Sequence, residues 1–457
     1  MPRIKYASLL RCLVILALLC LWIQIMLSAT NGGLASDEEE LMNMNETSEQ
    51  VLALVPAELH KYLTVHPKNV SSANATESRP LSIMEIRKLI ERHNDAQTIY
   101  NEDIFGPVQN DTVIIAIQVH TRLTYLRHLI VSLAQARDIE RTLLVFSHDY
   151  YDETINALVR SIDFTKVMQI FYPYSLQTHP DQFPGMDPND CPRDVKRDKA
   201  IQLKCNNALH PDLHGHYREA KYCQTKHHWW WKANRIFNQL QATAAHTGMV
   251  VFLEEDHYVA PDFLHMLRLL RDTADRSCPK CEMLCLGTYL KVYHYNVNSD
   301  RVEILPWHSS VHNMGMVFNK TVWNSIMEVQ EQFCAYDDYN WDYSLLHLSQ
   351  NRGGGREKFK VVLCKGPRVF HIGECGIHHK KSNCNASTVI GKVQRLLRAA
   401  RPHLFPARVA ATASAGGPKH NKRLGKGNGG WGDLRDREFC TNMTKIGRQM
   451  KKYFYGA

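Results

Sequence analysis

Short apolar runs alternate with amphipathic helical patterns from residue 112 onward, and this alternation restricts the fold more than any other feature of the sequence. The runs 112–118, 142–146 and 167–171 have the length of strands and are rich in aliphatic, often β-branched residues. Between them, apolar residues recur at helical spacing in 126–134, and Asp152 can cap a second amphipathic helix. This alternation predicts right-handed crossovers and a mostly parallel sheet flanked by helices, which is an α/β fold.

Polar side chains stand where the predicted strands end. They are Gln118, His120 and Arg122 after the first strand, and Ser147, His148 and Asp149 after the second. A fourth apolar run, 248–253, leads into the sequence Glu254-Glu255-Asp256-His257. Because ligands of open α/β sheets bind outside the carboxyl ends of the strands, these side chains are candidates for one common site.

The acidic sequence 254–257 has two interpretations. Carboxylate oxygens are the ligands that Mg²⁺ and Mn²⁺ prefer, so it can hold a divalent cation, but it can also be the polar edge of a buried sheet. A second apolar segment, 368–371, ends in another candidate ligand, His371. The sequence has no glycine-rich phosphate loop of either common spacing, so a bound diphosphate would depend on a metal instead.

Two aromatic-rich segments leave their roles open. Segment 224–232 begins a helical pattern that runs to about Ala245. Its Lys226 could contact a phosphate and its tryptophans could line a sugar or base site, or the group could belong to the core. Segment 336–342 holds three carboxylates among aromatic rings. Any of the three could be a general base with a raised pKa, or part of a helix-capping network, and their spacing does not choose among them.

The N-terminal residues predict a location in the secretory pathway. Basic residues precede an apolar segment, 9–29, that can span a membrane, and acidic residues 37–40 follow it. This order predicts an uncleaved signal-anchor with residues 1–8 in the cytosol, and a cleaved signal peptide is the alternative. A polar stretch without helical or strand period follows, so we expect a luminal stem over 30–105 and a folded domain over 106–457.

Glycosylation motifs and cysteines agree with that compartment. N-x-S/T triplets begin at Asn45, Asn69, Asn74, Asn110, Asn319, Asn385 and Asn442. Thirteen cysteines fit an oxidising environment, and the spacing of Cys278 and Cys281 favours a local disulfide over a zinc site.

Residues 408–457 hold eleven Lys/Arg against three Asp/Glu, so this tail accounts for eight of the nine net positive charges. The tail lacks regular aromatic interleaving, which argues against a nucleic-acid partner.

Several longer motifs resemble the N-acetylglucosaminyltransferase II family. They are QVHTR, FSHD, GHYREAKYCQTKHHWWWK, FLEEDHYVAPDF, HNMG, YDDYNWD, FHIGECGIHHKK and NGGWGD, in the order and near the spacing of that family. The resemblance covers about residues 110–440, nearly all of the predicted folded part. Fragments of this length make it specific.

The resemblance implies a GT-A fold and an inverting, Mn²⁺-dependent transfer. The expected donor is UDP-GlcNAc. The expected acceptor is O2 of the α1,6-arm mannose of an N-glycan core that already carries GlcNAc on its α1,3 arm, as hybrid N-glycans mature to complex ones. The implied location is the Golgi membrane, in type II orientation through one helix with the catalytic domain in the lumen. A homodimer is compatible with the resemblance.

Matched motif to motif, the functional residues of the family fall on the following positions. The nucleotide-sugar site would comprise Gln118, Val119, His120, Thr121, Arg122, Asp149, Gln224, Thr225, Lys226, His227 and His228. Asp256 and His371 would bind Mn²⁺, and Asp342 would take the proton from the attacking mannose hydroxyl. The metal, with Lys226 or Arg122, would stabilise the departing UDP. Thr121 departs from the family, which usually has asparagine there.

The resemblance also implies a disulfide framework. The matching pairs are Cys191–Cys205, Cys278–Cys281, Cys334–Cys440 and Cys375–Cys384, and the thiols left free are Cys223, Cys285 and Cys364. A fifth bridge of the family has neither of its cysteines here. An insertion at 353–355 and the Ala/Gly-rich segment 407–417 are further departures, and both are expected to be loops.

Two rival functions remain at this point. One is a non-catalytic, lectin-like glycan-binding protein that keeps the fold, and the other is a transferase of the same fold that acts on another arm or donor. The presence of Asp256, His371 and Asp342 argues against the first rival, because a protein without activity need keep none of them.

Overall fold

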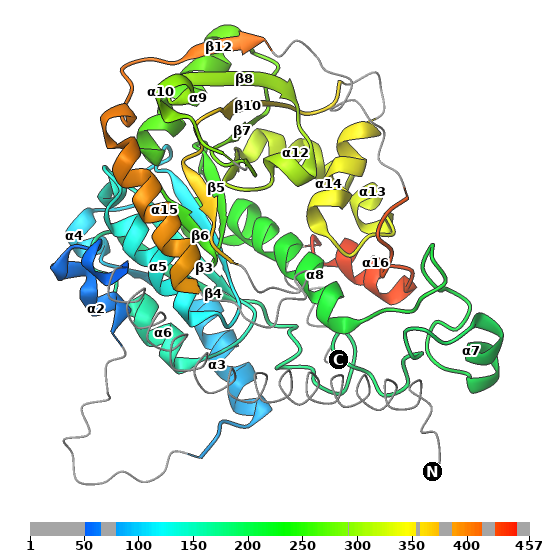
Figure 1. Ribbon diagram of the computed structural model, residues 1–457. Coiled ribbons are helices and arrows are strands. Elements are labelled where there is room, and N and C mark those ends of the chain that lie inside the picture. The colour runs from blue at the N-terminus through cyan, green and yellow to red at the C-terminus, as the bar shows by residue number, and fades with distance from the viewer. Residues whose placement is uncertain are drawn as a thin grey trace, which may run out of the picture.

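The computed structural model describes residues 51–64, 79–290, 292–352, 357–373, 386–413 and 426–445. Within these ranges one ten-stranded sheet has the order β1-β4-β3-β2-β5-β9-β7-β10-β8-β12, and β6 pairs separately with β11 (Figure 1). The protein is therefore a mixed α/β protein built around a large sheet, as the alternating patterns predict.

The half of the sheet that contains the predicted strands is parallel. Its strands are β4 (Lys166–Phe171), β3 (Leu143–His148), β2 (Ile114–Val119) and β5 (Val250–Glu254), and they confirm the four apolar runs. Alternate side chains of β2 enter different cores: Ile114 and Ala116 join one, and Ile115 and Ile117 join the other. Both faces of the sheet are covered, which explains why these strands read as continuous apolar runs.

Amphipathic helices cover the two faces. One core contains α5 (Leu123–Ala134), α6 (Glu153–Arg160) and α9 (Phe263–Ser277), and the other contains α8 (Ala220–Asn234), α12 (Lys320–Met327), α13 (Gln330–Ala335), α14 (Trp341–Gln350) and α16 (Leu434–Asn442). Asp152 caps α6 as predicted, because its side chain accepts a hydrogen bond from the backbone N–H of Ile155 at 2.9 Å.

The other half of the sheet mixes directions. Its strands are β9 (Met316–Phe318), β7 (Met283–Cys285), β10 (Lys360–Cys364), β8 (Arg301–Pro306) and β12 (Ala410–Ala413), and β9 runs antiparallel to both of its neighbours. The expectation of a loop throughout 407–417 is wrong at β12, which pairs parallel with β8. The composition suggests a loop, but the open edge of β8 supplies backbone hydrogen-bond partners that make an extended strand favourable.

A separate two-stranded sheet brings His371 to the acidic sequence. β6 (His257–Val259) pairs antiparallel with β11 (Val369–His371), and His257 lies opposite His371 in the register. Glu255 and Asp256 form the turn between β5 and β6. The apolar segment predicted at 368–371 is therefore a strand that ends beside this turn.

The helical pattern predicted from residue 224 to about Ala245 is interrupted in the structure. α8 starts earlier, at Ala220, and ends at Asn234, where a π-helical turn, Arg235–Gln239, and a 3₁₀ turn, Gln241–Thr243, follow. Ile236, Phe237 and Leu240 stay buried in the same core across this change. Apolar spacing alone therefore does not show where the α-helix ends.

Part of the segment predicted as stem packs on the sheet. α3 (Ile83–Ala96) lies against β4, and β1 (Ile99–Tyr100) pairs antiparallel with β4 at the edge of the sheet. Short helices α2 (His60–Leu63) and α4 (Glu102–Phe105) flank this region (Figure 1). Among the described helices none has the length and apolarity to cross a membrane, and the predicted anchor at 9–29 lies outside the described residues. The division into tail, anchor and stem stays a prediction.

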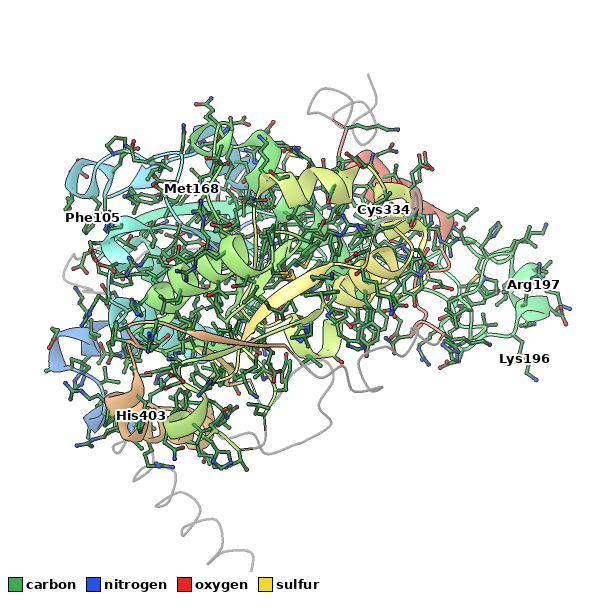
Figure 2. The ribbon with its side chains drawn as sticks, turned by 90° about the horizontal axis from the view of Figure 1, so that it is seen from above. Phe105, Met168, Lys196, Arg197, Cys334 and His403 are labelled. Atoms are coloured by element: carbon green, nitrogen blue, oxygen red, sulfur yellow. A yellow bond between two sulfur atoms is a disulfide. The ribbon has the colours of Figure 1, made fainter. Side chains whose placement is uncertain are left out.

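Three of the four implied disulfides are present. They are Cys191–Cys205, Cys278–Cys281 and Cys334–Cys440, and Cys375 and Cys384 lie outside the described residues. Cys223, Cys285 and Cys364 are free and buried, as the resemblance implies. Cys191–Cys205 closes the segment that carries α7 (Arg197–Leu203), which stands away from the sheet in both views (Figures 1 and 2). The other α-helices in the described part of the chain are α10 (Tyr295–Asn298), α11 (Ser309–His312) and α15 (Ala386–Ala400).

Candidate active site

The ends of β2 and β5 form the base of the candidate site. Gln118 of β2 and Glu254 of β5 are paired in register. The chain order reverses here, because β3 and β4 lie on one side of β2 and β5 lies on the other. Open α/β sheets bind ligands at such a switch point. The polar residues that follow β2, β3 and β5 therefore share one edge of the sheet.

Glu255 fixes the loop that follows β2. Its buried carboxylate accepts hydrogen bonds from the backbone N–H groups of His120 at 2.8 Å and Arg122 at 3.3 Å, and it pairs with Nε of Arg122 at 2.8 Å. Burial raises the pKa of Glu255, and the charge and hydrogen bonds of Arg122 oppose that shift. With these partners, Glu255 organises the loop rather than offering a free oxygen to a ligand.

Asp256 is the carboxylate that keeps an oxygen free. Its Oδ2 lies 2.8 Å from Nη1 of Arg122 and 3.1 Å from Nε2 of His371. Its Oδ1 is buried and has no hydrogen-bond partner among the described residues. Burial opposes ionisation, but the hydrogen bond and charge of His371 and the charge of Arg122 outweigh it and hold the pKa of Asp256 below its usual range. A buried polar atom without a partner costs about 1–3 kcal/mol, so this oxygen is placed for a ligand.

The residues around Asp256 fit a divalent cation. Ligand atoms of Glu254, Asp256 and His257 lie within 4.8 Å of one another. The Nδ1 of His257 accepts a hydrogen bond from the backbone N–H of Glu254 at 3.1 Å, and burial lowers the pKa of His257 to about 3. A neutral imidazole with an accepting Nδ1 carries its proton on Nε2, so His257 is a hydrogen-bond donor there and not a ligand. His371, whose Nε2 faces Asp256, is the better-placed histidine.

Gly373 lies directly against Asp256, just after β11. A Cβ atom at this position would overlap Oδ2 of Asp256 and would lie 3.1 Å from Nη1 of Arg122. Only a residue without a side chain lets the backbone approach so closely. Gly373 is therefore part of the wall that holds the Asp256 carboxylate.

Asp149 gathers a second group of the predicted residues, here called the Asp149 cluster: Asp149, His120, Gln224 and His228. Oδ1 of Asp149 lies 2.6 Å from Nδ1 of His120, and Oδ2 lies 3.0 Å from Nε2 of Gln224 and 3.5 Å from Nδ1 of His228. Burial opposes the charge of Asp149, but the hydrogen bond from His120 and the proximity of His228 outweigh it and lower its pKa. The structure thus brings four of the predicted residues together around one buried carboxylate.

Lys226 and His227 face away from the Asp149 cluster. Nζ of Lys226 donates hydrogen bonds to the carbonyl oxygens of Tyr336 at 3.1 Å and Asp338 at 3.0 Å, and Nε2 of His227 lies 2.9 Å from Oδ1 of Asp436 on α16. Residues four apart share a face of a helix, whereas their immediate neighbours do not. Lys226 is fully buried, and its contact with a phosphate stays a prediction.

The tryptophans of α8 belong to the core. Trp229 stacks on Trp341 of α14 with ring centroids 4.5 Å apart, and Trp230 stacks on Phe333 at 4.3 Å. Trp231 is buried as well. Of the two interpretations of this segment, the core role is confirmed, and the stack on Trp341 places α8 directly behind the start of α14.

Two of the three carboxylates in 336–342 connect loops. Asp337 accepts hydrogen bonds from the backbone N–H groups of Leu213 at 2.6 Å and Trp431 at 2.9 Å. Asp338 accepts hydrogen bonds from the backbone N–H groups of Asn340 and Asn428, both at 2.8 Å. The contacts with Leu213, Trp431 and Asn428 join segments that are far apart in the sequence. The N-cap residue of α14 is Asn340, without a side-chain cap, so these two carboxylates tie loops together and do not cap that helix.

Asp342 is the third carboxylate, and it lines a cleft. It lies in the first turn of α14, where Oδ1 accepts a hydrogen bond from the backbone N–H of Tyr343 at 2.9 Å and Oδ2 accepts one from Nδ2 of Asn313 at 3.1 Å. Burial raises the pKa of Asp342 to about 7, with smaller contributions from the charges of Asp338 and Glu254. A carboxylate with such a pKa can accept a proton near neutral pH.

Asp342 and the Asp256 region line the same cleft. The cleft has a volume of about 800 Å³. Its lining residues come from separate parts of the chain and include Thr225, Glu254, His257, Tyr289, Asn313, Tyr339, Trp341, Asp342, His371, Gly373 and Asn428. A carboxylate with a raised pKa and a candidate metal site therefore lie on the walls of one cavity.

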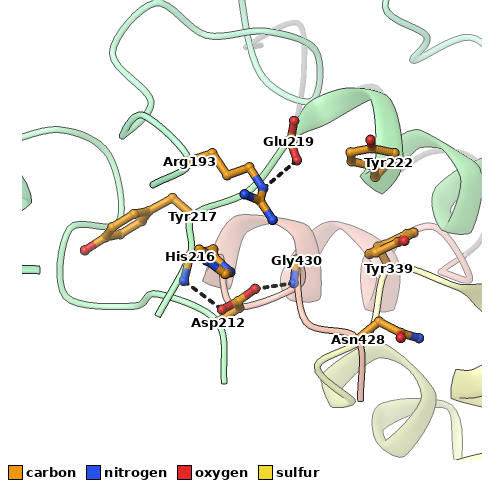
Figure 3. Close-up of a pocket in the computed structure, with 9 residues that line it drawn as sticks. All are labelled: Arg193, Asp212, His216, Tyr217, Glu219, Tyr222, Tyr339, Asn428 and Gly430. Atoms are coloured by element: carbon orange, nitrogen blue, oxygen red, sulfur yellow. Dashed lines mark hydrogen bonds and ion pairs between the residues drawn. The ribbon is translucent and has the colours of Figure 1, made fainter. Parts of the chain in front are cut away.

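A second, smaller pocket adjoins this cleft (Figure 3). It has a volume of about 480 Å³ and shares Tyr339 and Asn428 with the cleft. Polar groups converge on it: Nε of Arg193 pairs with Glu219 at 3.0 Å, and Asp212 accepts a hydrogen bond from the backbone N–H of Gly430 at 2.6 Å. The two cavities together form a polar, partly aromatic surface larger than one sugar requires.

Two further residues predicted for the nucleotide-sugar site, Val119 and Thr121, differ in their exposure to solvent. Val119 is buried in the core below the sheet, so only its backbone can face a ligand. Thr121 is exposed. Sequence reasoning missed Asn313 and Lys232, whose Nζ donates to Oε1 of Gln118 at 2.8 Å. The four-residue spacing of polar side chains along α8 could have found Lys232, whereas the contact of Asn313 joins distant segments and leaves no local signal.

Comparisons with known proteins agree on one family. The family model described as N-acetylglucosaminyltransferase II (MGAT2) matches residues 87–440. The alpha-1,6-mannosyl-glycoprotein 2-beta-N-acetylglucosaminyltransferase of Rattus norvegicus is 40% identical over 363 residues, 79% of this chain and 81% of the relative. The proteins of the same name from Homo sapiens and Arabidopsis thaliana are 39% and 31% identical, over 83% and 76% of this chain and 85% and 78% of their own lengths.

Solved structures align much more weakly. Staphylococcus aureus TarS, residues 1–349, aligns with a TM-score of 0.28 and 9% identity over 56% of this chain and 59% of its own. Glucosyl-3-phosphoglycerate synthase from Mycobacterium tuberculosis aligns with a TM-score of 0.28 and 10% identity over 71% of this chain and 86% of its own. Alignments this weak carry no argument about function. The family match and the relatives from Rattus norvegicus and Homo sapiens, which align over four fifths or more of their length, show that this chain is a glycosyltransferase of the N-acetylglucosaminyltransferase II family.

Proposed function

We propose that the protein transfers GlcNAc from UDP-GlcNAc to O2 of the α1,6-arm mannose of an N-glycan core that already carries GlcNAc on its α1,3 arm. The proposal includes a GT-A fold, inversion at the transferred carbon and dependence on Mn²⁺. The observation that carries it is the shared cleft, whose walls hold Asp342 and His371, the histidine that pairs with Asp256. Membership of this family supports the choice of donor and acceptor.

The proposed reaction is one direct displacement. The Asp342 carboxylate takes the proton of the mannose O2 hydroxyl, and O2 forms a bond to C1 of GlcNAc as the bond from C1 to the UDP oxygen breaks. The electron pair of the broken bond leaves with UDP. A single base suffices for this step, and no covalent enzyme intermediate is needed, because the configuration at C1 inverts once.

The cation would be held by Asp256 and His371. It would supply positive charge to the diphosphate and so offset the charge that develops on the leaving group. The free Oδ1 of Asp256 supports this assignment, and so does the chemistry of the donor set, because carboxylate oxygen and imidazole nitrogen both suit Mn²⁺. Arg122 pairs with Asp256 and Glu255 and so orients the carboxylates.

The pair of connected cavities supports a branched acceptor. The cleft would take the arm that reacts, and the adjoining pocket in Figure 3 would take another part of the same glycan. Aromatic rings such as Tyr339, shared by both cavities, suit the apolar faces of sugar rings, while the surrounding charged groups suit hydroxyls.

The proposed location is the Golgi membrane, in type II orientation, with residues 9–29 as the anchor and the catalytic domain in the lumen. Three disulfides support an oxidising compartment. The full-length protein expressed in cells is expected to lose mass on treatment with peptide N-glycosidase, and an unchanged mass would count against a luminal domain. The homodimer stays a prediction.

A panel of defined substrates tests the proposed specificity. UDP release would be measured with several UDP-sugars against N-glycan cores with and without GlcNAc on the α1,3 arm, each with and without Mn²⁺. We expect release only with UDP-GlcNAc, the primed core and Mn²⁺ together. Transfer to another arm or from another donor would favour the rival transferase, and glycan binding without any release would favour the lectin-like rival.

Transfer is expected to decline as the pH falls through about 7, because protonated Asp342 cannot take the hydroxyl proton. The pKa of this acid is raised, so its active carboxylate form dominates only above that pKa. The hydrogen bond from Asn313 favours the carboxylate, so Asn313→Ala should move the acidic limb of kcat/KM to higher pH. UDP affinity serves as the control and should not change. A limb at the same pH in both proteins would contradict this account.

A further inference from the structure

Lys232 is a buried lysine at the switch point between β2 and β5. Its side chain is 1% exposed, and its Nζ donates a hydrogen bond to Oε1 of Gln118 at 2.8 Å. Among the described residues no ion pair to a carboxylate within 4.0 Å joins this ammonium. A buried ion with one neutral partner costs several kcal/mol. Packing alone therefore does not explain a lysine at this position.

The negative charges at the ends of the strands offer a reason for a lysine at position 232. Arg122 pairs with Glu255 and Asp256, each at 2.8 Å. Glu254, which is paired in register with Gln118, has no ion pair within 4.0 Å among the described residues. Gln118 is also the residue that Lys232 contacts, so Lys232 brings a positive charge to the strand end that carries Glu254.

The helix also places Lys232 in line with the Asp149 cluster. Gln224, His228 and Lys232 are four residues apart, so they form one row on α8. Along this row Gln224 contacts Asp149 at 3.0 Å, His228 contacts Ser147 at 2.8 Å, and Lys232 contacts Gln118. The row thus runs behind the ends of β3 and β2, where the donor is proposed to bind.

We propose that Lys232 is a positioning residue of the donor site. Its ammonium holds the Gln118 side chain and balances the charge of Glu254, and thereby keeps the strand-end carboxylates in place for a nucleoside diphosphate and its divalent cation. Lys232 does not touch the reacting atoms. The inference rests on the proposed function, because it assumes that UDP binds with a metal at this edge.

Lys232→Met tests the proposal, because methionine removes the charge and keeps an unbranched apolar side chain. We expect Mn²⁺-dependent UDP affinity, measured by calorimetry on the full chain, to fall by roughly 10-fold or more, as it does when groups that support metal ligands are removed. The thermal midpoint should stay or rise, because replacing a buried charge with an apolar group of similar volume is often neutral or stabilising. Lys232→Arg keeps the charge and should recover part of the affinity.

Lys166→Met is the matched control, since it removes another buried lysine, the first residue of β4, which lies at the end of the strand away from the site. Its ammonium donates a hydrogen bond to the carbonyl oxygen of Phe105 at 3.3 Å, so its loss should change at most the thermal midpoint while UDP affinity is kept. Normal UDP affinity in Lys232→Met would overturn the inference. So would a loss of affinity matched by a loss of stability, which would show a purely structural role. Failure of the wild-type protein to bind UDP with Mn²⁺ would instead contradict the proposed function.

Discussion

Replacing Asp342 with asparagine is expected to abolish transfer while UDP binding survives. Asparagine keeps the size of the side chain and one accepting oxygen, so the contact with the backbone N–H of Tyr343 can persist. It cannot take a proton from the acceptor hydroxyl. Loss of a general base lowers turnover by roughly 10²–10⁴-fold. UDP release with the primed core measures the loss, and calorimetry with UDP and Mn²⁺ measures the binding that should remain.

Asp337→Asn is the matched control from the same motif. Asp337 accepts two backbone hydrogen bonds, from Leu213 and Trp431, and asparagine can accept only one of them. We expect a lower thermal midpoint with turnover of the folded protein within a few-fold of normal. Near-normal turnover of Asp342→Asn, or an equal loss in both variants, would remove Asp342 from the role of base.

The parallel half of the sheet could be predicted, and the half with mixed strand directions could not. β2, β3 and β4 are each six residues long and buried on both faces, so they appear as unbroken apolar runs. β9 and β7 have three residues each, too few to show any period. Their pairing depends on contacts between segments distant in sequence, which no local pattern records.

The residues of the candidate site were likewise predictable in part. Residues at strand ends, such as Asp149 and Asp256, could be grouped from the sequence because parallel strands end at one edge. On α8 the two lysines were harder to tell apart, because Lys226 and Lys232 are the same residue type on one helix. Only the rotation of the helix, fixed by stacks such as Trp229 on Trp341, turns one lysine to the loops of α13 and α14 and the other to the sheet.

Removing the Asp256 carboxylate is expected to lower transfer as much as removing the base Asp342 does. The loss should arise earlier, when UDP and Mn²⁺ bind. In Asp256→Ala, His371 and Arg122 lose their shared partner and the free Oδ1 disappears. Because the cation would then lack a direct ligand, Mn²⁺-dependent UDP binding should vanish along with transfer, whereas Asp342→Asn should keep that binding. Unchanged UDP affinity in Asp256→Ala would remove Asp256 from the metal site.

Gly373→Ala tests the same carboxylate without removing it. The added Cβ would overlap Oδ2 of Asp256, so the carboxylate or the backbone after β11 must shift. Displacing a ligand by a neighbouring group lowers metal affinity by roughly 10–100-fold, and we expect UDP binding at limiting Mn²⁺ to fall accordingly and to recover at high Mn²⁺. Gly391→Ala on α15 is the matched control, because its Cβ would meet only the side-chain ends of Arg395 and Val51. Equal UDP affinities in the two glycine variants would show that the position of Asp256 tolerates displacement. If only Gly373→Ala loses UDP affinity and regains it at high Mn²⁺, the loss is due to weaker binding of the cation.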